Sequence, residues 1–163
     1  MLSLRLHHFL DARHAPYSTL THECTITTQQ TPNVAHIRTR NFAKTVMLKV
    51  DGTLAMLVMP AAYRIDLLRL SRAMGGNAGE LAQEDEFKNA FPDCETGAMP
   101  PFGNLYGVPV YVDSRLTGQA EIAFNAGSHT EVVRIPYEES ERMPYEESER
   151  LTQPELLWLV HVM

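Results

Sequence analysis

Residues 43–60, AKTVMLKVDGTLAMLVMP, carry the strongest structural signal in the chain. Two apolar, partly β-branched runs lie on either side of Asp51-Gly52, a dipeptide that favours two-residue type I′ turns. The segment therefore predicts a β-hairpin whose two strands are largely buried.

The patterns on both sides of this hairpin predict a mixed domain of helices and strands. Helical periodicity with a possible Ser3 cap, apolar alternation and glycine stops mark the other elements. We expect helices at 3–12, 64–74 and 83–90, and strands at 15–23, 108–113, 120–127 and 130–135. Their order predicts an α+β or mixed α/β fold, a single domain over residues 1–163 with a mostly antiparallel mixed sheet and flanking helices.

Length and composition are those of an ordinary globular protein. The chain has 163 residues, 44% hydrophobic and 21% charged, which suffices for one buried core. We see no apolar run of membrane-spanning length and no signal-peptide pattern near the N-terminus. Two cysteines, Cys24 and Cys94, make no disulfide framework. We therefore expect a cytoplasmic protein with reduced thiols and no membrane contact.

The charge distribution leaves two interpretations open. A net charge of −6 argues against broad nucleic-acid binding, yet residues 38–72 contain seven basic and only two acidic side chains. This excess is either a set of solvated surface charges or a local patch for a few phosphates.

The C-terminal part contains a repeat, PYEESER at 136–142 and again at 144–150. A period of eight overshoots two helical turns by about 80°, and Pro144 would interrupt a continuous helix. We interpret residues 136–150 as a local tandem duplication that forms two short turns, lies away from the functional cleft and has no chemical role. The alternative is an acidic surface for partner docking.

Motifs for the common catalytic chemistries are missing. The histidines have no metal-ligand spacing, and no serine lies in a GxSxG elbow. Cys24 lies near His22, but no sequence pattern supports a nucleophile there, and we interpret it as a non-catalytic thiol. We therefore expect no metal and no cofactor.

The loop GAMPPFG, residues 97–103, has no reactive side chain. Its prolines fix two φ angles and its glycines allow close backbone approach to a ligand. The N–H groups of Ala98, Met99, Phe102 or Gly103 are therefore candidate preorganised donors. Lys44, at the start of the first hairpin strand, either marks a sheet edge or points into a cleft. We expect it to share one cleft with the loop.

Four segments in order resemble the YbaK/ProX-type aminoacyl-tRNA editing domains, which include free-standing trans-editing deacylases and the insertion domain of prolyl-tRNA synthetases. They are Tyr17–Gln30, Phe42–Leu70, Glu95–Asp113 and Glu121–Ile135. The hallmarks are the lysine of an AKT-like strand start, here Lys44, and a GxxxP loop, here residues 97–101.

The resemblance implies hydrolysis of the ester between a wrong amino acid and the terminal adenosine of tRNA, without a metal or a protein nucleophile. The partner would be the 3′ acceptor end of a mischarged tRNA. The implied catalytic residues are Lys44, Gly97 and Ala98. The substrate-binding candidates are Tyr17, His22, Thr28, Met99, Pro100, Pro101, Phe102, Gly103, Gly127 and His129. A non-catalytic tRNA-end or protein-binding module of the same fold is the alternative.

Two features depart from the family pattern. The segment TTQQTPNVAHIRTRN has Gln30 where the family has an acid, and the PYEESER doubling is not a family feature. Removing one copy would change the net charge from −6 to −4, because a copy has three Glu and one Arg. The edited amino acid, a transient synthetase contact and a monomer or homodimer state stay open.

Overall fold

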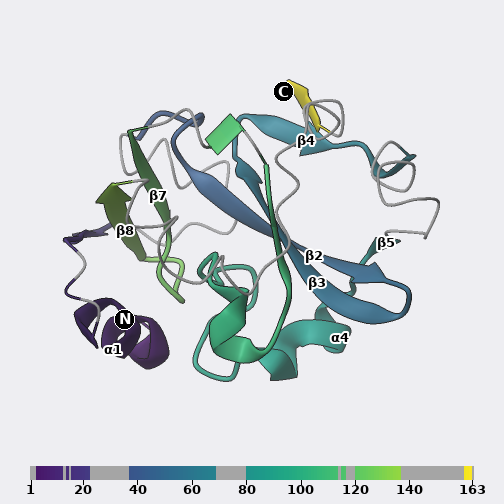
Figure 1. Cartoon of the computed structure of the whole chain (residues 1–163), viewed down its shortest axis with the longest axis horizontal. Coiled ribbons are helices and arrows are strands. Elements are labelled where there is room, and N and C mark those ends of the chain that lie inside the picture. Colours follow the sequence, from purple (N-terminus) through teal and green to yellow (C-terminus); the bar gives the residue numbers. More distant parts are fainter. Residues whose placement is uncertain are drawn as a thin grey trace.

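The structure, a computed structural model, describes residues 3–12, 14, 16–22, 37–68, 80–113, 115–116, 120–136 and 160–162 (Figure 1). Its helical elements are α1 (Leu4–Ala12), α4 (Glu84–Phe87), η1 (Lys88–Ala90) and η2 (Gly103–Tyr106). Its strands are β1 (Ser18–Thr21), β2 (Ala43–Val50), β3 (Thr53–Pro60), β4 (Tyr63–Ile65), β5 (Glu80–Leu81), β6 (Val110–Val112), β7 (Glu121–Asn125), β8 (Glu131–Pro136) and β9 (Val160–Val162).

The predicted hairpin is confirmed as the antiparallel pair β2–β3, in register from Ala43 opposite Pro60 to Val50 opposite Thr53. Its turn residues Asp51 and Gly52 have φ angles of 52° and 79°. Two positive φ angles are what a type I′ turn requires, so the Asp-Gly dipeptide sets the register of the hairpin.

The strands form sheets in the orders β5-β2-β3-β6, β1-β8-β7 and β4-β9. The β3–β6 pair is parallel, whereas the other strand pairs of these sheets are antiparallel. An isolated parallel bridge between Phe42 and Ala123 joins the hairpin to β7. The predicted fold class, a single α+β domain with mostly antiparallel strands, is confirmed.

The main core lies between the hairpin, the β7–β8 pair and α1. Leu6 and Leu10 of α1 are fully buried there, together with Met47 and Phe124. Phe102, from the GAMPPFG loop, packs edge-on against the Phe124 ring, with 5.3 Å between the two ring centroids. Burying several large apolar side chains of this kind, each favourable by about 2 kcal/mol, holds the elements together.

The helix predicted at 64–74 is wrong at its start. Arg64 and Ile65 belong to β4, where Tyr63 and Ile65 pack on an apolar cluster with Leu48 and Arg64 is exposed. This alternation suits a strand, and Leu67-Leu68, the last described residues of the predicted segment, are helical. Residues 69–74 and the repeat from 137 to 150 lie outside the described residues.

The Ser3 cap of α1 fits the structure, with Ser3 Oγ 3.5 Å from the Leu6 N–H. Within the described ranges, no helix is long and apolar enough to span a membrane.

Candidate functional site

Strand β2 presents its side chains to two different surroundings. Ala43 and Met47 belong to the main core, whereas Phe42 packs in the cluster of Ala123 and Val46 packs in the cluster of Tyr63. Because side chains alternate along a strand, Lys44 lies on the face of Phe42 and Val46, away from the main core.

Lys44 is half-buried and donates a hydrogen bond from Nζ to the carbonyl oxygen of Tyr63 at 2.6 Å. Burial, and secondarily the nearby Arg64 charge, lowers the pKa of its ammonium group below the ordinary value. Lys44 is therefore a cation whose solvation is incomplete, and an anionic or strongly polar ligand would stabilise its charge.

Strands β2 and β7 meet at the Phe42–Ala123 bridge, run in the same direction and then separate. Lys44 and Asn125 each lie two residues beyond the bridge. Ile122 and Phe124 belong to the main core, so Asn125 shares the face of Ala123. Lys44 and Asn125 therefore occupy matching positions on the two strands, and we call the region between these strands beyond the bridge the β2–β7 gap.

The GxxxP loop closes the core side of the β2–β7 gap. On one side, Thr45 Oγ1 donates to the carbonyl oxygen of Met99 at 3.2 Å. On the other side, the Gly127 N–H donates to the carbonyl oxygen of Ala98 at 2.9 Å. Thr45, one residue on from Lys44, thus faces the loop, and the expectation that Lys44 shares one cleft with the loop stays a prediction.

The side chains of the loop are packing groups. Met99 and Phe102 are buried in the main core, and Pro100 and Pro101 are also buried. A role of these residues in substrate binding would therefore fall mainly to the backbone, and it stays a prediction. A Cβ on Gly103 would lie 2.7 Å from the Val108 carbonyl oxygen, so this glycine serves close packing.

Some backbone N–H groups of the loop already have partners within the protein. The Ala98 N–H donates to the Glu95 carbonyl at 3.0 Å, and the Gly97 N–H lies 3.2 Å from the Met99 sulfur. Gly97 has a φ of +89°, which favours glycine at this position. Within the part of the chain that the structure describes, the N–H groups of Met99, Phe102 and Gly103 have no hydrogen-bond acceptor, so they are donors that a ligand could use.

The β7–β8 turn brings two predicted residues to the loop. His129 Nε2 lies 3.0 Å from the Thr96 carbonyl oxygen, and its ring carbon Cε1 lies 3.6 Å from where a Cβ on Gly97 would be. Gly127, with a φ of +98°, holds the loop through its N–H. His129 and Gly127 therefore lie next to Gly97 and Ala98 in the structure, although they are about 30 residues away in the sequence.

The other sequence candidates are dispersed. The Tyr17 hydroxyl contacts Asp11 and His7 on α1. The His22 N–H donates to the Thr130 carbonyl oxygen at 2.8 Å, next to His129. Thr28 lies outside the described residues.

Asn125 is a candidate that the sequence interpretation missed. Its side chain is only 5% exposed, and its Oδ1 is buried without a hydrogen-bond partner among the described residues. A buried amide oxygen without a donor is unfavourable by about 1–3 kcal/mol, so a ligand N–H or O–H would satisfy it. The signal was an asparagine at the end of an otherwise apolar strand, FNAG.

Cys94 is a poor nucleophile in this environment. Its sulfur lies 3.2 Å from the Tyr106 hydroxyl, and burial raises the pKa of the thiol to about 11. The thiol is thus protonated at neutral pH, and the thiolate is the reactive form. Cys24 lies outside the described residues.

Comparison with known proteins identifies the family. Residues 22–143 match the aminoacyl-tRNA editing domain, so the chain belongs to this family. The match contains Lys44, the GxxxP loop and the β7–β8 turn, and it ends between the two copies of the repeat. A search of curated proteins finds no significant match.

Solved structures share the fold at low sequence identity. One is described as a "putative trans-editing enzyme for prolyl tRNA synthetase", with 18% identity, a TM-score of 0.74 and coverage of 91% of this chain and 93% of that chain. Another, "hypothetical protein APE2540", has 16% identity, a TM-score of 0.76 and coverage of 90% and 97%. These likenesses establish the architecture.

Proposed function

We propose that the protein hydrolyses the ester bond of mischarged aminoacyl-tRNA and acts as a trans-editing deacylase in the cytoplasm. The observation that carries the proposal is the half-buried Lys44 ammonium group, on the strand whose next residue, Thr45, holds the GxxxP loop. Membership of the editing-domain family supports the same reaction class.

Lys44 would bind the 3′ end of the tRNA. Its half-buried ammonium group suits a phosphate oxygen or the carbonyl oxygen of the ester, since incomplete solvation strengthens its attraction for an anion. The Met99 N–H would stabilise the negative charge that develops on the carbonyl oxygen. Asn125 would orient the aminoacyl group, because its buried Oδ1 can accept from the α-amino group.

The chemistry requires little more than positioning, because an aminoacyl ester is already activated. A water molecule, positioned with help from the neighbouring ribose hydroxyl, attacks the carbonyl carbon. The carbon–oxygen bond to the ribose breaks, and a proton passes to the ribose oxygen. The products are the free amino acid and a tRNA with an intact 3′ end, and no covalent bond to the protein forms.

The test is the release of labelled amino acid from a panel of mischarged tRNAs. Lys44→Ala should lower kcat/KM by more than tenfold on the responsive tRNA, a loss of at least ~1.4 kcal/mol of transition-state stabilisation. Lys49→Ala is the matched control, because Lys49 lies on the same strand but pairs with Glu86 at 2.9 Å. It should change the rate less than twofold. An unchanged rate in a folded Lys44→Ala protein would reject the role of Lys44.

The alternative is a non-catalytic module of the same fold that binds tRNA ends or a protein. It predicts no amino acid release from any tRNA in the panel, together with measurable binding of the uncharged RNA. The panel therefore distinguishes the two functions directly.

A further inference from the structure

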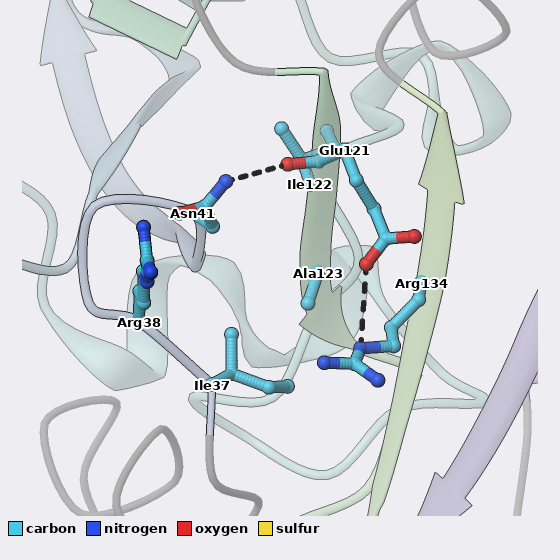
Figure 2. Close-up of a pocket in the computed structure, with 7 residues that line it drawn as sticks. All are labelled: Ile37, Arg38, Asn41, Glu121, Ile122, Ala123 and Arg134. Carbon is cyan, nitrogen blue, oxygen red and sulfur yellow. Dashed lines mark hydrogen bonds and ion pairs between the residues drawn. The ribbon is translucent and has the colours of Figure 1, made fainter.

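A polar pocket of about 330 Å³ lies on the other side of the Phe42–Ala123 bridge from the β2–β7 gap. Its walls come from the turn before β2 and from β7 and β8 (Figure 2). The lining residues are Ile37, Arg38, Asn41, Glu121, Ile122, Ala123 and Arg134.

Two guanidinium groups lie on opposite sides of this pocket (Figure 2). Arg38 is exposed and has no ion-pair partner among the described residues. Arg134 Nε is 3.5 Å from Glu121 Oε1, and one terminal nitrogen of Arg134 points toward Ile37 in Figure 2. The Asn41 side chain donates to the Glu121 backbone carbonyl at 3.0 Å, which fixes the turn against β7.

The charges of the pocket favour an anion. Two guanidinium groups and one carboxylate leave a local charge of +1 in a protein whose net charge is −6. Arg134 Nε is also buried without a geometrically good hydrogen bond, since its distance to Glu121 is long. Guanidinium donors match phosphate oxygens in geometry and charge.

We propose that this pocket binds a phosphodiester of the tRNA acceptor strand, upstream of the ester held in the β2–β7 gap. The inference rests on the proposed function. Ala123, at the centre of the pocket, precedes Asn125 by two residues on the same face, or about 7 Å along the strand. This separation is comparable with the length of one nucleotide, so one strand can occupy both places.

Binding of uncharged RNA tests the pocket without any catalysis. The probe is a labelled RNA hairpin with a single-stranded 3′ end, followed by fluorescence anisotropy over a series of salt concentrations. Arg38→Ala should weaken binding about fivefold or more and reduce the slope of log K against log salt by about 0.7, as expected for one lost phosphate contact on a single strand.

Arg40→Ala is the matched control, because Arg40 is exposed in the same turn but does not line the pocket. It removes the same charge and should weaken binding less than twofold. Equal losses in Arg38→Ala and Arg40→Ala would overturn the proposal. Tight binding of adenosine monophosphate without Arg38-dependent RNA binding would also overturn it, because the pocket would then serve a free nucleotide.

Kinetics separate binding from chemistry. Arg38→Ala should raise the KM for aminoacylated RNA with kcat retained, and it should not change hydrolysis of an aminoacyl-adenosine that lacks the phosphate. An equal loss on both substrates would overturn the proposal. If no aminoacyl ester is hydrolysed at all but RNA binding still depends on Arg38, the proposed function fails and the phosphate pocket stands.

Discussion

The ammonium group of Lys44 is subject to two influences that act in the same direction. Burial removes part of its water, and the Arg64 charge on β4 adds repulsion; both lower its pKa. If the charged form binds the substrate, deacylation must decline on the alkaline side when Lys44 loses its proton. Because the pKa is lowered, this decline begins at a lower pH than for an exposed lysine.

Arg64→Ala should move the alkaline decline in activity to higher pH, because it removes the repulsive charge while Arg64 itself is exposed. The measurement is kcat/KM from about pH 7 to about pH 10.5, spanning the ordinary lysine range, with spontaneous ester hydrolysis subtracted. Arg64→Lys keeps the charge and should retain the wild-type profile. A decline that stays in place in Arg64→Ala would contradict the role of the Lys44 charge.

At the scale of elements, Ser3 at the start of α1 is hydrogen-bonded to Asp93, in the segment that precedes the GxxxP loop. Ser3 Oγ donates to Asp93 Oδ2 at 2.5 Å, and the Tyr106 hydroxyl donates to Asp93 Oδ1 at 2.7 Å. The Ser3 N–H also donates to the Ala126 carbonyl, and a Cβ on Gly127 would meet the Ser3 side chain at 2.9 Å. The helix thereby braces the turn that holds the loop.

Asp93→Asn should destabilise the protein by about 1–3 kcal/mol at neutral pH, because two hydrogen bonds lose their charged acceptor. Burial alone would raise the pKa of Asp93, but the hydrogen bonds from Ser3 and Tyr106 outweigh it and lower the pKa below its ordinary value. A carboxylate with a lowered pKa stabilises the fold above the unfolded pKa, near 3.9, and this contribution is lost as pH falls through the folded pKa.

The difference in thermal midpoint between the wild type and Asp93→Asn, followed from about pH 6 downward, measures this contribution. It should be largest near pH 6 and shrink below about pH 4. A constant difference over the whole range would show that the charge of Asp93 is not responsible. Asp85→Asn, an exposed change on α4, is the control and should have a small effect throughout.

For the molecule as a whole, one copy of the repeat can be removed without changing the residue types that end β8. Pro136 ends β8 opposite Glu121, and the family match ends at Met143. Removing residues 136–143 places Pro144-Tyr145 directly after Ile135, which restores the same two residue types at the end of β8. The strand pairing that supports the β7–β8 turn is therefore retained.

Deletion of residues 136–143 should shift the thermal midpoint by less than about 4 °C, equivalent to about 1 kcal/mol, and should leave deacylation near the wild-type rate. It also changes the net charge from −6 to −4, since three Glu and one Arg are lost. Loss of activity in a folded deletion variant would mean that the repeat belongs to the functional surface, and our interpretation of it would then be wrong.

The sequence by itself determined the β2–β3 hairpin, the mixed α+β class and the motifs of the editing-domain family. These depend on local chemistry: Asp51-Gly52 adopts positive φ angles readily, and the apolar runs beside it need no distant partner to be recognised. Lys44 and the GxxxP loop were likewise visible as short motifs.

Only the tertiary structure decided what these motifs face. The Phe42–Ala123 bridge joins residues 81 positions apart and places Asn125 and Lys44 two residues beyond the same point. The inward direction of Met99, the contact of the loop with Thr45 and the polar pocket at Arg38 and Arg134 also arise from long-range pairing. A local pattern tells which residues share a face of one strand, but the neighbour of that face is set by the packing of the whole chain.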